Sequence, residues 1–95
     1  MPAQALYLLN NPFVRGQALH FARSLLKETA DEAGRVRSAY RRALGRPPTG
    51  AEVSEAREYL DAYARRVKAG SDARLAAWQS YCQMLFCLNE FLYVD

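Results

Sequence analysis

Apolar residues recur every three or four positions along most of the chain, which is the spacing of an α-helix with one buried face. The stripes are Val14, Ala18, Phe21 and Leu25, then Val36, Tyr40, Ala43 and Leu44, then Val53, Ala56, Leu60, Tyr63 and Val67. A shorter apolar stretch over residues 3–9 precedes them, and a longer one follows. The pattern predicts an all-α fold, a compact bundle of four main helices after a short N-terminal helix.

The first helix boundaries are marked by Asn11 and Asp31. Asn11 is placed to cap a helix that has Pro12 at its first position and runs to about Lys27 or Glu28. Proline disfavours helix for the residue before it, so this turn separates the short N-terminal helix from the next. Asp31 is placed to cap the third helix.

The sharpest local signal is the connection after Leu44. Gly45 ends the third helix, and Arg46-Pro47-Pro48 cannot continue it. Thr49 followed three residues later by Glu52 is a capping box that opens the fourth helix. Gly70 then marks the next stop.

The last predicted helix, from Ala73 to about Phe91, is apolar nearly all round and therefore belongs in the middle of the bundle. We expect Trp78 to be largely buried. The remaining aromatic residues of this segment are core or interface. Between residues 75 and 94 there is more apolar surface than three short helices obviously cover, which favours an interaction or structural module whose exposed patches face the rest of a larger protein.

Charge is unevenly distributed along the chain. The total is +3, from 13 Lys and Arg against 10 Asp and Glu. Residues 15–46 carry eight basic and three acidic side chains, and no basic residue follows Arg74. The arginine-rich third helix makes weak nucleic-acid binding the alternative function, but the small net charge and the lack of a nucleic-acid motif favour a solvated face.

No catalytic, cofactor-binding or metal-binding set is apparent. The one histidine, His20, falls on the polar side of its helix, and the acidic residues Glu52, Glu55 and Glu58 lack a partner histidine. The two cysteines, Cys82 and Cys87, lie about 140° apart around a helix, which argues against a disulfide between them. They read as core residues. We expect a non-catalytic chain without zinc or haem.

Targeting signals are also missing from the sequence. Residues 1–10 lack the basic start of a signal peptide, and polar residues interrupt the most apolar window, residues 75–94, so we expect no membrane span. The cellular compartment stays undetermined.

Three segments together resemble a known family: residues 8–14 (Leu-Leu-Asn-Asn-Pro-Phe-Val), residues 40–49 with Glu52, and residues 89–95 (Asn-Glu-Phe-Leu-Tyr-Val-Asp). Their order is similar to the C-terminal end of a domain of unknown function in large planctomycete proteins, many of which begin with a cytochrome-c-like haem domain (PSD1-type). The resemblance implies a single helical domain over residues 1–95, an excised C-terminal fragment whose haem-attachment cysteines lie elsewhere. Export or display at the cell surface is one reading for the parent proteins.

What the resemblance implies about residues is structural. The family signatures match Asn11, Pro12, Gly45, Arg46, Pro47, Thr49, Glu52 and Glu90, and no catalytic residue carries over. The expected partners are the other domains of the parent protein or a second copy of the chain. Glu90 lies in an apolar run where an unpaired charge would be costly, so we expect a cationic partner, Arg46 first and Arg41 or Arg42 otherwise.

Overall fold

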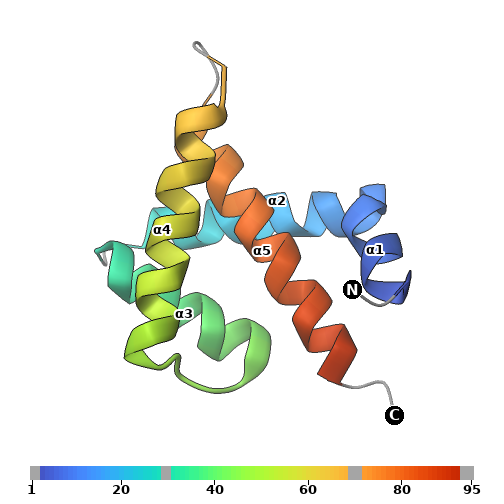
Figure 1. Ribbon diagram of the computed structural model, residues 1–95, viewed down its shortest axis with the longest axis horizontal. Helices are drawn as coiled ribbons and strands as arrows, with labels where there is room; N and C mark the ends of the chain where they lie inside the picture. The colour runs from blue at the N-terminus through green and yellow to red at the C-terminus, as the bar shows by residue number, and fades with distance from the viewer. Residues whose placement is uncertain (1–2, 29–30, 69–71, 93–95) are drawn as a thin grey trace.

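Five helices make up the residues that the computed structural model describes, which are residues 3–28, 31–68 and 72–92. They are α1 (Ala3–Asn10), α2 (Pro12–Lys27), α3 (Glu32–Leu44), α4 (Gly50–Arg66) and α5 (Ala73–Leu92) (Figure 1). Side chains are described for residues 7–28, 31–68 and 72–88. No strand occurs within these ranges, so the prediction of an all-α bundle with a short first helix is confirmed.

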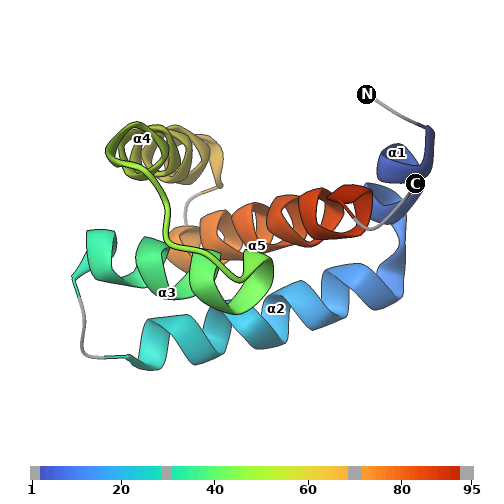
Figure 2. The same ribbon diagram turned by 90° about the horizontal axis from the view of Figure 1, so that it is seen from below.

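Helix α5 occupies the centre, as its nearly continuous apolar surface predicts. It contacts each of the other four helices, and Figure 2 shows it between α2 on one side and α4 on the other. Trp78 and Cys82 are fully buried on this helix, and Tyr81 and Leu85 are almost so. The expected burial of Trp78 is therefore confirmed.

Helix α2 starts where the sequence indicates. The side-chain oxygen of Asn11 accepts hydrogen bonds from the backbone N–H groups of Phe13 (2.8 Å) and Val14 (3.2 Å), and Pro12 is the first helical residue. The helix buries Ala18, Phe21, Ala22 and Leu25 against the core. His20 is exposed, as predicted for the polar side.

Helix α3 differs from the expectation that its arginines point into solvent. Asp31 caps it through the N–H of Gly34 (2.8 Å), and Val36, Ala39 and Tyr40 are buried, as the pattern requires. However, the side chain of Arg35 is only 14% exposed, 3.6 Å from Glu32. The cause is the packing of α3 beside α2, which places Arg35 and Arg42 at the seam between the two helices.

Helix α4 begins at the predicted capping box but ends earlier than Gly70. Its last residue is Arg66, and Val67 adopts an extended conformation (φ −76°, ψ 140°). Gly70 lies outside the described residues. The predicted apolar face is corrected in one position, because Tyr63 is 36% exposed whereas Tyr59 packs against the core and shares a hydrogen bond with Ser80.

Two glutamines of α5 hold the corner between α1 and α2. The side-chain amide of Gln83 donates to the backbone carbonyl of Leu9, and that of Gln79 donates to the carbonyl of Arg15 at 3.1 Å. Gln79 and Gln83 are one helical turn apart and so project from the same face of α5. They therefore tie the backbone on both sides of this corner to α5.

The cysteines are separate and buried. Burial raises the pKa of the Cys82 thiol to about 12 and the pKa of the Cys87 thiol above its usual value. A buried thiol with a raised pKa is a poor nucleophile and a poor metal ligand. Within the described ranges no helix has the length and apolar character needed to cross a membrane.

Candidate functional site

The predicted signature residues of the α3–α4 connection form one hydrogen-bonded unit. Gly45 adopts a left-handed conformation (φ 74°, ψ 14°), and its N–H donates to the carbonyl of Arg41 at 3.0 Å. Only glycine takes this conformation readily, since other residues are strained there. The chain therefore reverses direction at the position that the sequence indicates.

Glu52 is the centre of this unit. Its carboxylate accepts from the backbone N–H of Thr49 (2.9 Å) and from both terminal nitrogens of Arg46 (2.8 Å each), while its own N–H donates to the Thr49 hydroxyl (3.1 Å). The Arg46 hydrogen bonds, followed by that of Thr49, lower the pKa of Glu52 to about 2. Arg46 also donates to the carbonyl of Pro47 (3.1 Å).

This arrangement bears on the expected pair between Arg46 and Glu90. The side chain of Glu90 lies outside the described residues, so the pair stays a prediction. Both terminal nitrogens of Arg46 already bind Glu52, and its guanidinium lies over the ring of Tyr40, 5.3 Å from the centroid. The predicted signature residues of this connection therefore hydrogen-bond to one another and stabilise the turn between α3 and α4.

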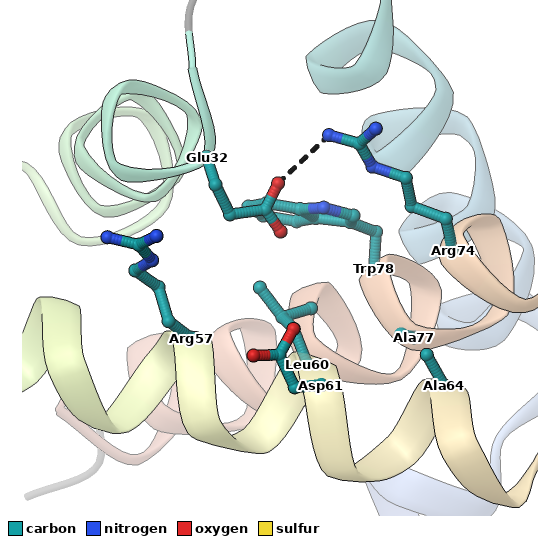
Figure 3. A pocket seen from close by; sticks show the side chains of 8 residues that line it. All are labelled: Glu32, Arg57, Leu60, Asp61, Ala64, Arg74, Ala77 and Trp78. Atoms are coloured by element: carbon teal, nitrogen blue, oxygen red, sulfur yellow. Dashed lines mark hydrogen bonds and ion pairs between the residues drawn. The ribbon is translucent and has the colours of Figure 1, made fainter.

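A cleft that the sequence pattern did not predict lies where the beginning of α3, the C-terminal half of α4 and the beginning of α5 meet (Figure 3). Its volume is about 400 Å³. The floor is apolar and the rim is charged. The lining residues are Glu32, Arg57, Leu60, Asp61, Ala64, Arg74, Ala77 and Trp78.

The charged side chains at the rim of this cleft are equal in number and opposite in sign. Figure 3 shows Glu32 reaching across the cleft to Arg74, and the two are joined at 3.0 Å. Arg57 and Asp61 enter from α4, so two guanidinium groups face two carboxylates. The described residues that line the cleft include neither a histidine nor a hydroxyl or thiol nucleophile, and their charges favour neither an anionic nor a cationic ligand.

The indole N–H of Trp78, which lines this cleft, is unusual in its surroundings. The indole nitrogen is buried and has no hydrogen-bond acceptor among the described residues. A buried indole N–H usually finds a partner. Glu32 lies in front of the ring in Figure 3 but does not accept this hydrogen bond.

A second concave feature, which we call the α2 groove, follows the outer side of α2. It consists of two hollows, of about 180 and 280 Å³, that share Gln17 and Phe86. The first hollow is lined by Leu8, Phe13, Val14, Gln17 and Phe86, and the second by Gln17, His20, Phe21, Ser24, Arg42, Ala43 and Phe86. The groove brings together α1, α2, α3 and α5.

Aromatic stacking shapes the second hollow. The rings of Phe21 and Phe86 stack with centroids 5.5 Å apart, and the guanidinium carbon of Arg42 lies 4.7 Å from the Phe21 centroid. Arg42 also binds Glu28 at 3.3 Å and Ser24 at 3.4 Å. Sequence reasoning missed this site, because helical spacing assigned Phe21 to the core and Arg42 to solvent.

A third concave feature, the α4–α5 hollow, has a volume of about 260 Å³. Its lining residues are Tyr40, Glu52, Glu55, Ala56, Tyr59, Tyr81, Met84, Leu85 and Leu88. Leu88 is 46% exposed at its edge. Among the described residues, no group of three or more His, Cys, Asp or Glu side chains is placed to hold a metal ion.

The described residues define a small all-α fold whose surface carries grooves and one charged cleft. The family described as PSD1, protein of unknown function (DUF1553), matches residues 1–60. The match covers more than half of the chain, so the protein belongs to this family. It includes the Asn-Pro turn and the α3–α4 connection, whereas residues 89–95 lie outside it. No curated protein and no solved structure matches the chain significantly.

Proposed function

We propose that the chain is a non-catalytic helical module that packs against other polypeptide of a larger protein. The observation that supports this most is the exposure of Phe13, of which 73% is accessible although the residue sits in the first turn of a firmly capped helix. Aromatic residues on rigid elements are the usual anchors of protein interfaces. Tyr7 on the neighbouring helix α1 is also exposed, to 67%.

The parent protein that we propose is of the planctomycete cytochrome-c-like type, with this module at its C-terminal end. The support is the resemblance of residues 89–95, together with membership of the family through residues 1–60. The other domains of that protein are the proposed partners. A second copy of the chain is the alternative partner that we propose.

The absence of a catalytic or cofactor role is part of the proposal. His20 is exposed and has no carboxylate partner among the described residues, and Glu55 and Glu58 are exposed on α4. Cys82 is fully buried with a raised pKa. We therefore expect the purified chain to bind neither zinc nor haem. Metal analysis and absorption spectra after incubation with each would contradict this if either bound stoichiometrically.

Nucleic-acid binding gains no support from the arrangement of α3. Arg42 binds Glu28 and Ser24, and Arg35 donates to the carbonyl of Glu28 at 3.3 Å beside Glu32. Arg37 and Arg41 are exposed on this helix without a partner among the described residues, whereas Arg42 is also exposed but already has a carboxylate partner. Phosphate binding grows with the number of available cations, so two are a weak basis for it.

Hydrogen exchange can test the proposed role. The exchange of backbone amides is compared between this chain alone and the same residues within the full-length parent protein. We expect slower exchange near Phe13 or near Leu88 in the parent, because packed neighbours protect the amides beneath them. Identical exchange throughout would refute the interaction role.

A further inference from the structure

We propose that the α2 groove is a docking site for an acidic polypeptide segment that inserts an apolar side chain beside Phe13 and sets a carboxylate against Arg42. The proposal rests on the interaction role above and specifies its partner. It is argued from the size of the groove, the chemistry of its two ends and the charge around it.

The size of the groove suits side chains. Each hollow, of about 180 or 280 Å³, has room for one or two side chains. Because they share Gln17 and Phe86, the two hollows adjoin each other along α2. From Phe13 to Ser24 is eleven residues of helix, or about 16 Å, which about five residues of an extended chain span.

The end of the groove near α1 is apolar. Leu8, Val14 and Phe86 surround it, and Phe13 stands at its edge. Asn11 accepts hydrogen bonds from the first turn of α2, and Gln83 donates to the carbonyl of Leu9. These bonds fix this end, so little conformational freedom is lost on binding. A leucine- or phenylalanine-like side chain would cover the exposed face of Phe13.

The other end offers hydrogen-bond donors. Gln17, His20, Ser24 and Arg42 line it together. Glu28 binds one terminal nitrogen of Arg42, whereas the other contacts only the Ser24 hydroxyl, at 3.4 Å. The side chain of Arg42 is 45% exposed, so a second carboxylate has access to it.

The surrounding charge favours an acidic partner. Helix α2 has Arg15, Arg23 and Lys27 and no acidic residue. Across residues 12–46 eight basic and three acidic side chains give a net charge of +5. A field of one sign steers oppositely charged partners to the surface and disfavours like-charged ones.

A polypeptide is favoured over a nucleic acid because of the apolar end. Sugar and phosphate have no apolar side chain to place in the hollow of Leu8, Val14 and Phe86. The exposed arginines Arg37 and Arg41 do not line either hollow. Duplex binding is therefore an outcome that the test must distinguish.

The test is an NMR titration of the intact chain with three probes. The first is the peptide acetyl-Asp-Phe-Asp-Leu-Asp-amide, the second replaces each aspartate by lysine, and the third is a twelve-base-pair DNA duplex. We expect the acidic peptide to shift the amide signals of Gln17, Ser24 and Phe86 saturably, and the lysine peptide to leave them in place. Equal effects of the two peptides, or no effect of the acidic one at these residues, would overturn the proposal. Binding of the duplex at the groove in place of the peptide would overturn it as well.

Two pairs of variants identify the groove. Gln17→Glu puts a negative charge where the two hollows meet and should weaken peptide binding about tenfold, whereas Ser54→Glu makes the same change in charge on exposed α4 and should not. Phe13→Ser should weaken binding similarly, and Tyr7→Ser, an equally exposed aromatic outside both hollows, should have little effect. All four positions are at the surface or at its edge, so the variants are expected to fold. Equal effects within either pair would exclude the groove.

The hydrogen-exchange experiment separates this proposal from the broader one. Protection near Leu88 with none along α2 in the parent protein would leave the interaction role standing and refute docking in the α2 groove. Peptide binding in the groove without any protection in the parent would refute the interdomain role and keep the groove as a site for a separate acidic polypeptide.

Discussion

Arg46 and Glu52 form a two-pronged ion pair, in which each terminal nitrogen of the guanidinium lies 2.8 Å from one carboxylate oxygen. The pair joins the α3–α4 connection to the first turn of α4, where a negative charge also interacts favourably with the helix dipole. The Arg46 side chain is 49% exposed and that of Glu52 26%. Solvent therefore screens the electrostatic attraction, and the main effect of the pair is to fix the geometry of the connection.

The pH dependence of stability should reflect this pair. The pKa of Glu52 is lowered from 4.5 to about 2 by Arg46 and Thr49. A carboxyl group whose pKa is lower in the folded than in the unfolded state stabilises the fold at every pH above its unfolded pKa. The contribution of Glu52 to the free energy of unfolding is therefore complete above about pH 4.5 and is lost as the pH falls towards 2. Urea unfolding across this range should show a smaller loss for Glu52→Gln than for the unmodified chain. A Glu52 carboxyl signal that titrates near 4.5 in NMR would contradict the expectation.

Loss of the α4 cap should be measurable. Replacing Thr49 by Ala removes the acceptor for the N–H of Glu52 and should lower the free energy of unfolding by about 1 kcal/mol. His20→Ala is the control, because this side chain is exposed and its loss should cost under about 0.5 kcal/mol. Denaturant melts of both variants give the comparison. A larger effect at His20 would mean that the assigned faces of α2 are wrong.

Gly45 should resist substitution for a backbone reason. A Cβ at this position meets no atom within 4 Å, yet φ is 74°, so Gly45→Ala should cost about 1 to 2 kcal/mol through conformation alone. Gly50 offers a matched control, since it also has open space around it and starts α4 without a positive φ. Gly50→Ala should be neutral or slightly stabilising. Thermal melts that rank the two variants the other way would refute this.

Trp78 should carry the largest single share of core stability. It is fully buried and meets Tyr81 edge-on, with centroids 5.9 Å apart. Trp78→Ala should cost roughly 3 to 5 kcal/mol and could unfold a domain of this size. Trp78→Phe retains most of the volume and provides a folded variant for comparison. As the only tryptophan, it should fluoresce at short wavelength and resist quenching by iodide, and a red-shifted, freely quenched emission would exclude burial.

The sequence predicted where α2 and α4 begin because capping is local. Asn11 and Thr49 contact backbone groups two or three residues away, so their neighbours in sequence determine their roles. The grooves were not predictable in this way. Arg42 lies over Phe21, and Phe86 stacks on the same ring, through contacts between helices far apart in the sequence.

The same limit applies to the polar residues of α5. Helical spacing places Gln79 and Gln83 on one face but does not show that they bind the carbonyls of Arg15 and Leu9. Nor does it show that Arg46 binds Glu52, because a capping box requires only Thr49 and Glu52. In each case the partner depends on how the helices cross, which periodicity does not determine.

The central position of α5 has a consequence for the order in which the protein can fold during synthesis. The apolar faces of α2, α3 and α4 leave the ribosome before the helix that covers them. Until Trp78 and Leu85 emerge, these faces have only one another to pack against, and α2 and α4 lie on opposite sides of the space that α5 fills (Figure 2). During synthesis the chain therefore passes through an interval in which this apolar surface is exposed, and the interval ends only when α5 is available to pack against it.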